Sequence, residues 1–73
     1  MPTPTSRCTV PALRYHRLHR LLTQEQVAAA AAVSVPTIIR AEGGKPVGAL
    51  TAEKLARALG VSVRQLRETP PEE

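Results

Sequence analysis

Apolar residues recur at helical spacing in several short blocks of this chain. In the block that opens at Thr23, the side chains of Val27, Ala28 and Ala31 share one narrow face of a helix. Thr23 is followed three residues later by a glutamine, which is the spacing of a reciprocal capping box. The pattern predicts a helix over residues 24–31.

A second helical block follows with no room for a loop. Ser34 can cap its start, Pro36 falls in its first turn, where proline is tolerated, and Gly43-Gly44 ends it. Because Pro36 would break one continuous helix, the two blocks predict separate helices at an angle, over residues 24–31 and 35–42. Two short helices joined by a tight turn form a helix-turn-helix, whose second helix can enter the DNA major groove.

Three further helices are expected, because each stretch has a capping residue and an apolar face. They cover residues 10–21, 52–59 and 63–68, with Thr9, Thr51 and Ser62 as their N-caps. In the first of them, Leu13, Arg17 and Leu21 share one face. No alternating pattern is long enough to predict a strand.

The predicted fold is therefore all-α, a compact five-helix domain with a helix-turn-helix. Residues 1–9 are expected to form a flexible N-terminal arm, residues 10–68 the domain, and residues 69–73 an acidic tail or linker. The last segment also fits the start of a linker, so the chain could be the N-terminal part of a longer regulator.

The amino-acid composition restricts the kind of core and the cellular compartment that we expect for this domain. Phe and Trp are absent and Tyr is single, so the core must be built from small aliphatic side chains. No run approaches the roughly 18 apolar residues of a membrane helix, and the N-terminus lacks the apolar region of a signal peptide. The single cysteine, Cys8, excludes an internal disulfide and fits a reducing compartment. We expect a cytoplasmic protein without membrane contact.

Charge is unevenly placed along the chain. The formal net charge is +4, but three of the six acidic residues lie in the last six positions. Residues 1–67 hold ten Lys and Arg against three Glu, a net charge of +7. A basic body favours a polyanionic partner, with nucleic acid first, although charge alone leaves open a merely soluble basic protein.

Residues 13–66 resemble the Cro/phage-repressor (XRE) family, a lambda-repressor-like group of helix-turn-helix proteins. The resemblance is carried by TQEQVA at residues 23–28, Val33-Ser34, Ile38, Arg40, EGGK at residues 42–45, KLA at residues 54–56, ALGVS at residues 58–62 and Leu66. It implies a five-helix domain that binds double-stranded DNA, usually as a homodimer on a two-fold operator. The chain departs from the family at Ala32, where glycine is usual, and at His16, where leucine is usual.

The resemblance assigns base contacts to four residues of the second helix of this unit, namely Val35, Pro36, Ile39 and Arg40. Arg40 is the strongest candidate, because bidentate pairing of arginine with guanine is the commonest specific base contact. Val35 and Ile39 offer methyl groups that suit the thymine methyl. The alternative is that these exposed apolar side chains bind a protein partner.

Phosphate contacts are expected from a second set of residues. Gln24 opens a helix, where the backbone N–H groups and the helix dipole favour an anion. Ser34 and Thr37 carry short hydroxyl donors, and Lys45 follows the Gly-Gly turn. By resemblance, Arg17 forms an ion pair with Glu42 beside the DNA backbone, and this pair would orient Arg17 toward phosphate.

The remaining candidate sites are a dimer interface, a metal site and a catalytic site. Val63 and Leu66, near the C-terminal helix, are expected at a dimer interface, with closure of the monomer core as the alternative. His16, His19 and Cys8 lack a fourth ligand for zinc, so no metal and no cofactor are expected. Asp is absent, and no catalytic set is present, so an enzyme is not expected. The prediction is a transcriptional repressor; the alternative is an antitoxin or adaptor that binds a protein through the same fold.

Overall fold

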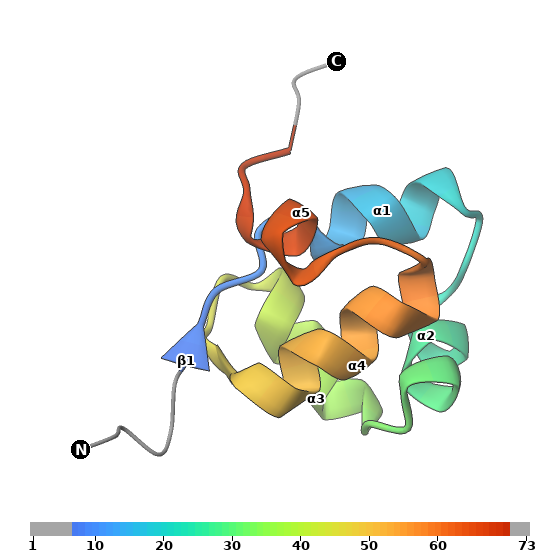
Figure 1. Cartoon of the computed structure of the whole chain (residues 1–73). Coiled ribbons are helices and arrows are strands. Elements are labelled where there is room, and N and C mark those ends of the chain that lie inside the picture. Colours follow the sequence, from blue (N-terminus) through green and yellow to red (C-terminus); the bar gives the residue numbers. More distant parts are fainter. Residues whose placement is uncertain (1–6, 71–73) are drawn as a thin grey trace.

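The computed structural model describes residues 7–70, in which five helices and two short strands follow one another (Figure 1). The strands are β1 (Arg7–Cys8) and β2 (Val47–Gly48), and the helices are α1 (Leu13–His19), α2 (Gln24–Ala31), α3 (Val35–Glu42), α4 (Ala49–Leu59) and α5 (Val63–Arg67). The expected five-helix fold is confirmed. Within these residues no helix is long and apolar enough to span a membrane.

The helix-turn-helix forms where the sequence predicts it. Helices α2 and α3 have the expected bounds, and the capping box at the start of α2 is present. In that box, the Gln26 N–H donates to Thr23 Oγ1 at 3.0 Å, and the Thr23 N–H donates to Gln26 Oε1 at 2.8 Å. These two bonds satisfy two N–H groups that a helix start otherwise leaves unpaired.

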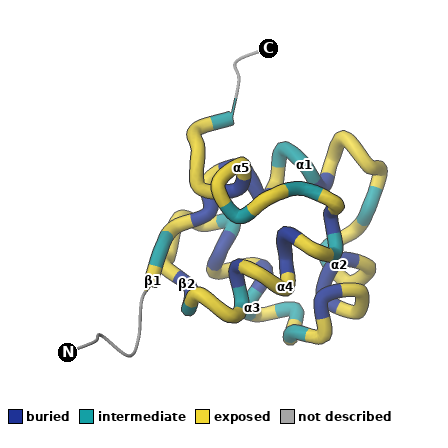
Figure 2. Tube along the Cα trace, viewed as in Figure 1, coloured by how far each residue is buried: buried dark blue, intermediate teal, exposed yellow. Residues whose placement is uncertain are grey.

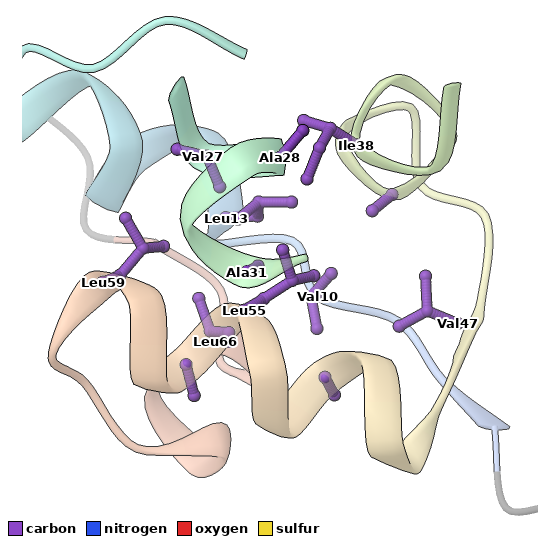
Figure 3. Close-up of a cluster of buried hydrophobic side chains, with 13 residues drawn as sticks. Val10, Leu13, Val27, Ala28, Ala31, Ile38, Val47, Leu55, Leu59 and Leu66 are labelled. Carbon is purple, nitrogen blue, oxygen red and sulfur yellow. The ribbon is translucent and has the colours of Figure 1, made fainter. Parts of the chain in front are cut away.

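One apolar core joins all five helices. Each helix contributes at least one fully buried side chain. Figure 2 maps the buried residues along the chain trace. Leu13, Ile38 and Leu55, from α1, α3 and α4, point into a common interior (Figure 3). The predicted apolar face of α2 is confirmed as well, since its three residues are buried. The core therefore fixes α2 and α3 relative to the rest of the domain.

The first helix differs from its prediction at both ends. It begins at Leu13, with Ala12 at the N-cap and no side-chain cap, so Thr9 does not cap it. Ala12 is nearly fully buried and its N–H donates to Leu66 O at 3.1 Å, so contact with α5 sets the start. The helix ends at His19, and Leu21 has a φ of 57° and is 89% exposed. Leu21 therefore does not share the buried face of Leu13.

A small antiparallel sheet was not expected. Strand β1 pairs with β2, with Arg7 opposite Gly48 and Cys8 opposite Val47. Arg7 and Cys8 thus belong to a paired strand, while residues 1–6 of the expected arm lie outside the described residues, as do residues 71–73 of the tail. Two-residue strands are too short to give an alternating pattern, which is why the prediction of no strand was wrong.

The pairing also moves the start of α4. This helix begins at Ala49, directly after β2, with Gly48 at its N-cap and no side-chain cap. Thr51 lies inside the first turn, so the expected Thr51 cap was wrong. The C-terminal end matches its prediction, because Gly60 closes the helix in the left-handed region at φ 70°.

Candidate nucleic-acid interface

The angle between α2 and α3 is set by a tight turn at Ala32. This residue ends α2 in the left-handed region, with φ 59° and ψ 43°. The Val33 N–H donates to Ala28 O at 3.0 Å, which closes the end of the helix. Ser34 then caps α3 by accepting the Thr37 N–H at 3.3 Å. The turn is therefore three residues long, with a capping hydrogen bond at each of the two helix ends.

The outer face of α3 holds the residues expected to read bases. Ile38 and Ala41 have no exposed area, so they anchor the helix in the core. At 3.6 residues per turn, Pro36, Ile39 and Arg40 fall within an arc of about 100° on the opposite face. All three are exposed, Ile39 to 52%. Val35 is only half-buried and flanks this arc, so the four residues form one outward surface.

Three polar residues are joined on the Ile39 edge of α3. Arg17 Nε donates to Glu42 Oε2 at 2.6 Å, and Arg17 Nη2 donates to Glu42 Oε1 at 3.1 Å. Arg17 Nη1 also donates to Leu22 O at 3.0 Å. The ion pair expected from the resemblance is therefore present, and it is well shielded, with side-chain exposures of 11% and 8%.

The same carboxylate holds Gln24 at the start of α2. Gln24 Nε2 donates to Glu42 Oε1 at 3.0 Å, a contact that sequence reasoning missed because 18 residues separate the two. Each guanidinium nitrogen of Arg17 is already bonded inside the protein, to Glu42 or to Leu22 O, and Arg17 and Gln24 share the Glu42 carboxylate. The Arg17 guanidinium group therefore has no pair of unbonded nitrogens for a bidentate contact with phosphate. Thr23 Oγ1 accepts the Gln26 N–H at the start of α2, and the other N–H groups that a helix start leaves without intrahelical partners suit an anion.

Ser34 and Thr37 are engaged with each other. Their hydroxyl oxygens lie 2.8 Å apart, and the Ser34 hydroxyl also serves as the cap of α3. Both hydroxyls keep acceptor or donor capacity at the helix start. Their first role in this structure is to fix the N-terminus of α3.

Lys45 returns to the C-terminal end of α3. The Gly44 backbone has φ 92°, which suits glycine, and the Lys45 N–H donates to Arg40 O at 3.0 Å. Lys45 is exposed and lies beside Arg40 around one hollow. The predicted backbone-contacting lysine is thus adjacent to the predicted base-reading arginine.

Comparison with known protein families identifies the family of this chain. The family described as helix-turn-helix matches residues 13–66, which is most of the chain. The chain belongs to the XRE family of helix-turn-helix proteins. No curated protein and no solved structure matched the chain significantly. The XRE family is one of DNA-binding regulators, so this chain is a DNA-binding helix-turn-helix regulator.

The two residues expected at a dimer interface differ in their exposure to solvent in this XRE domain. Val63 is partly exposed on α5 and packs against the edge of the core. Leu66 has no exposed area and lies in the monomer core, so its side chain is not available on the surface. A dimer contact through α5 would therefore use Val63 and not Leu66.

Proposed function

We propose that this chain is a sequence-specific transcriptional repressor that binds a two-fold DNA operator as a homodimer. The observation that carries the proposal is the outward face of α3, where Arg40 stands with Val35, Pro36 and Ile39 on a helix anchored by buried residues. An exposed arginine on such a helix suits bidentate contact with guanine O6 and N7. The neighbouring apolar side chains suit thymine methyl groups.

Backbone contacts complete the proposed interface. Gln24, held by Glu42, presents the start of α2 to a phosphate, and Lys45 follows the C-terminal end of α3. Ser34 and Thr37 add hydroxyl groups at the start of the reading helix. Such contacts fix the position of α3 in the groove and carry no sequence information themselves.

The small reading surface supports the proposal of a homodimer. One α3 offers a single charged base reader, and one such helix covers too few base pairs for a distinctive site. Two copies with their reading helices about 34 Å apart would read two half-sites one DNA turn apart. Val63 on α5 is the described surface residue we assign to this contact. Repression is the proposed outcome, since a dimer in the major groove blocks other proteins from that duplex.

Selection of bound sites from random duplex DNA tests this function, followed by fluorescence anisotropy on the enriched site at several salt concentrations. We expect an enriched palindrome, tighter binding to it than to a scrambled duplex, and affinity that falls steeply with salt. Enrichment of no sequence would contradict the proposal. DNA affinity that does not fall with salt would contradict the proposed phosphate contacts.

A further inference from the structure

A basic hollow of about 470 Å³ lies against the edge of α3 that carries Thr37 and Arg40. Its lining comes from three separate parts of the chain and consists of Arg7, Thr37, Arg40, Lys45, Pro46, Val47, Gly48 and Thr51. Three of these residues are cations, and none of the carboxylates within residues 7–70 lines it. The hollow therefore concentrates positive charge beside the base-reading surface.

Arg7 reaches this place because strand β1 is held against β2. Arg7 lies opposite Gly48, and the next residue pair in the ladder includes Val47, which is buried in the core. Arg7 Nη1 also donates to Pro46 O at 3.4 Å. The backbone of Arg7 is thus fixed relative to α3 by the strand pairing, even though it precedes the helical domain in sequence.

The charges around the hollow favour an anion between them. Arg7, Arg40 and Lys45 repel one another, and that repulsion falls when a negative group sits among the three. Thr37 and Thr51 bring hydroxyl groups to the same lining. Phosphate is the anion that such a mixture of guanidinium, ammonium and hydroxyl donors suits.

The hollow lies on the opposite edge of α3 from Gln24. Glu42, three residues after Ile39, holds Gln24 on one edge, while Thr37 and Arg40 stand on the other. A major groove about 12 Å wide is bordered by one sugar-phosphate strand on each side. A helix in that groove therefore has the strand near Gln24 on one side and a second strand near the hollow.

We propose that the hollow binds a backbone phosphate of that second strand, and that Arg7 is a DNA-binding residue positioned by the β1–β2 pairing. This inference rests on the proposed DNA-binding role of α3. The three cations are exposed to solvent, so each remains hydrated when the protein is free. A phosphate that is held in place by the rest of the duplex suits such an open site better than a free phosphate ion.

Salt titration of DNA binding tests the role of Arg7. The probe is a short fluorescein-labelled duplex of random sequence, and its anisotropy is followed across a series of NaCl concentrations. Arg7→Ala should weaken binding and reduce the slope of log K against log salt by about 1, as expected for one lost phosphate contact. Arg7→Lys should keep the slope, because it keeps the charge.

Arg57→Ala is the matched control. It removes the same charge from an exposed position in the last turn of α4 and from outside the hollow. Its slope should equal that of the native chain. If the native chain binds DNA and the two variants Arg7→Ala and Arg57→Ala have the same slope of log K against log salt, Arg7 acts only through net charge and the inference is wrong.

Cys8→Pro tests the positioning by the strand. Proline removes the backbone N–H and restricts φ, which weakens pairing with β2. Cys8→Pro should keep the helical circular dichroism signal of the native chain. Its slope of log K against log salt should fall by as much as that of Arg7→Ala. The double variant Arg7→Ala with Cys8→Pro should show no further fall in that slope. An undiminished slope would show that Arg7 acts without the pairing and would overturn the proposed positioning.

Two further outcomes separate the inference from the function on which it rests. If the native chain binds no duplex even at low salt, the DNA-binding function itself fails. If inorganic phosphate binds the native chain but not Arg7→Ala, while Arg7→Ala leaves the salt dependence of DNA binding unchanged, the hollow is a site for free phosphate. That last result would overturn the assignment to the DNA backbone.

Discussion

At the scale of residues, Glu42 connects α1, α2 and α3 through its two carboxylate oxygens. It accepts hydrogen bonds from Arg17 and Gln24, and these three side chains come from three different helices. Such a shielded ion pair adds little net stability over apolar packing, but removal of one partner leaves a buried charge and costs about 3–5 kcal/mol. The pair therefore fixes the position of Gln24 relative to α3.

The sequence predicts some of these residue roles and not others. Ile38 and Ala41 follow from helical periodicity, because the capped start of α3 fixes the phase of the helix. The exposed position of Leu21 could not be predicted from periodicity, since α1 stops two residues earlier. The contact between Gln24 and Glu42 depends on the packing of two helices, and no local pattern contains it.

His16 makes stability depend on pH. Partial burial lowers the pKa of His16 below its ordinary value of 6.5, and the charges of Arg20 and His19 lower the pKa further. The unfolded chain takes up this proton at a higher pH than the folded protein does. The free energy of unfolding should therefore fall as the pH drops below 6.5, and this fall should stop once folded His16 is protonated too.

Urea unfolding at a series of pH values measures this effect. His16→Gln should flatten the curve of unfolding free energy in the window just below pH 6.5. The native chain in the same buffers is the reference. Equal slopes for the two proteins would show that His16 is not the group responsible.

At the scale of elements, the turn between α2 and α3 forms with a residue that does not favour it. Ala32 adopts φ 59°, a region that costs a residue with a Cβ about 1–2 kcal/mol relative to right-handed backbone. The sequence identifies this position by comparison with the family, which usually has glycine there. The two capped helices and the buried Val27, Ala28 and Ile38 hold the turn closed in spite of that cost.

Ala32→Gly should stabilise the domain. Glycine adopts the left-handed region freely, and this gain exceeds its extra freedom in the unfolded chain, so we expect the free energy of unfolding to rise by about 0.5–1 kcal/mol. Ala30→Gly, at an exposed right-handed position in the last turn of α2, is the control and should lower the free energy of unfolding by about 0.5–1 kcal/mol. Chemical denaturation measures both, and a loss of stability in both variants would contradict a strained turn.

The elements outside the helix-turn-helix were harder to predict at their ends. Thr9 and Thr51 have good capping side chains, yet α1 and α4 start at other residues. Contacts between distant residues set the start of both helices. The Ala12 N–H donates to Leu66 O at the start of α1, and the paired strand β2 leads directly into α4. Local capping preferences are worth about 1 kcal/mol, so burial and strand pairing readily override them.

At the scale of the whole molecule, positive charge and the reading surface coincide. All ten Lys and Arg residues precede the acidic C-terminal end, and the hollow beside α3 gathers Arg7, Arg40 and Lys45 from three parts of the chain. The net charge could be predicted from the sequence. The clustering of these three cations could not be predicted, because the position of Arg7 depends on the β1–β2 pairing. In the proposed function, charge brings the protein to DNA and α3 selects the sequence.

Arg40 offers the most direct test of that account. The measurement is the affinity of the native chain and of Arg40→Ala for the selected site and for a panel of its single base-pair substitutions. We expect Arg40→Ala to lose about 1–3 kcal/mol on the selected site and to become indifferent to one G·C pair in each half-site. A uniform loss across the whole panel, with the native base preferences unchanged, would contradict the claim that α3 reads DNA through Arg40.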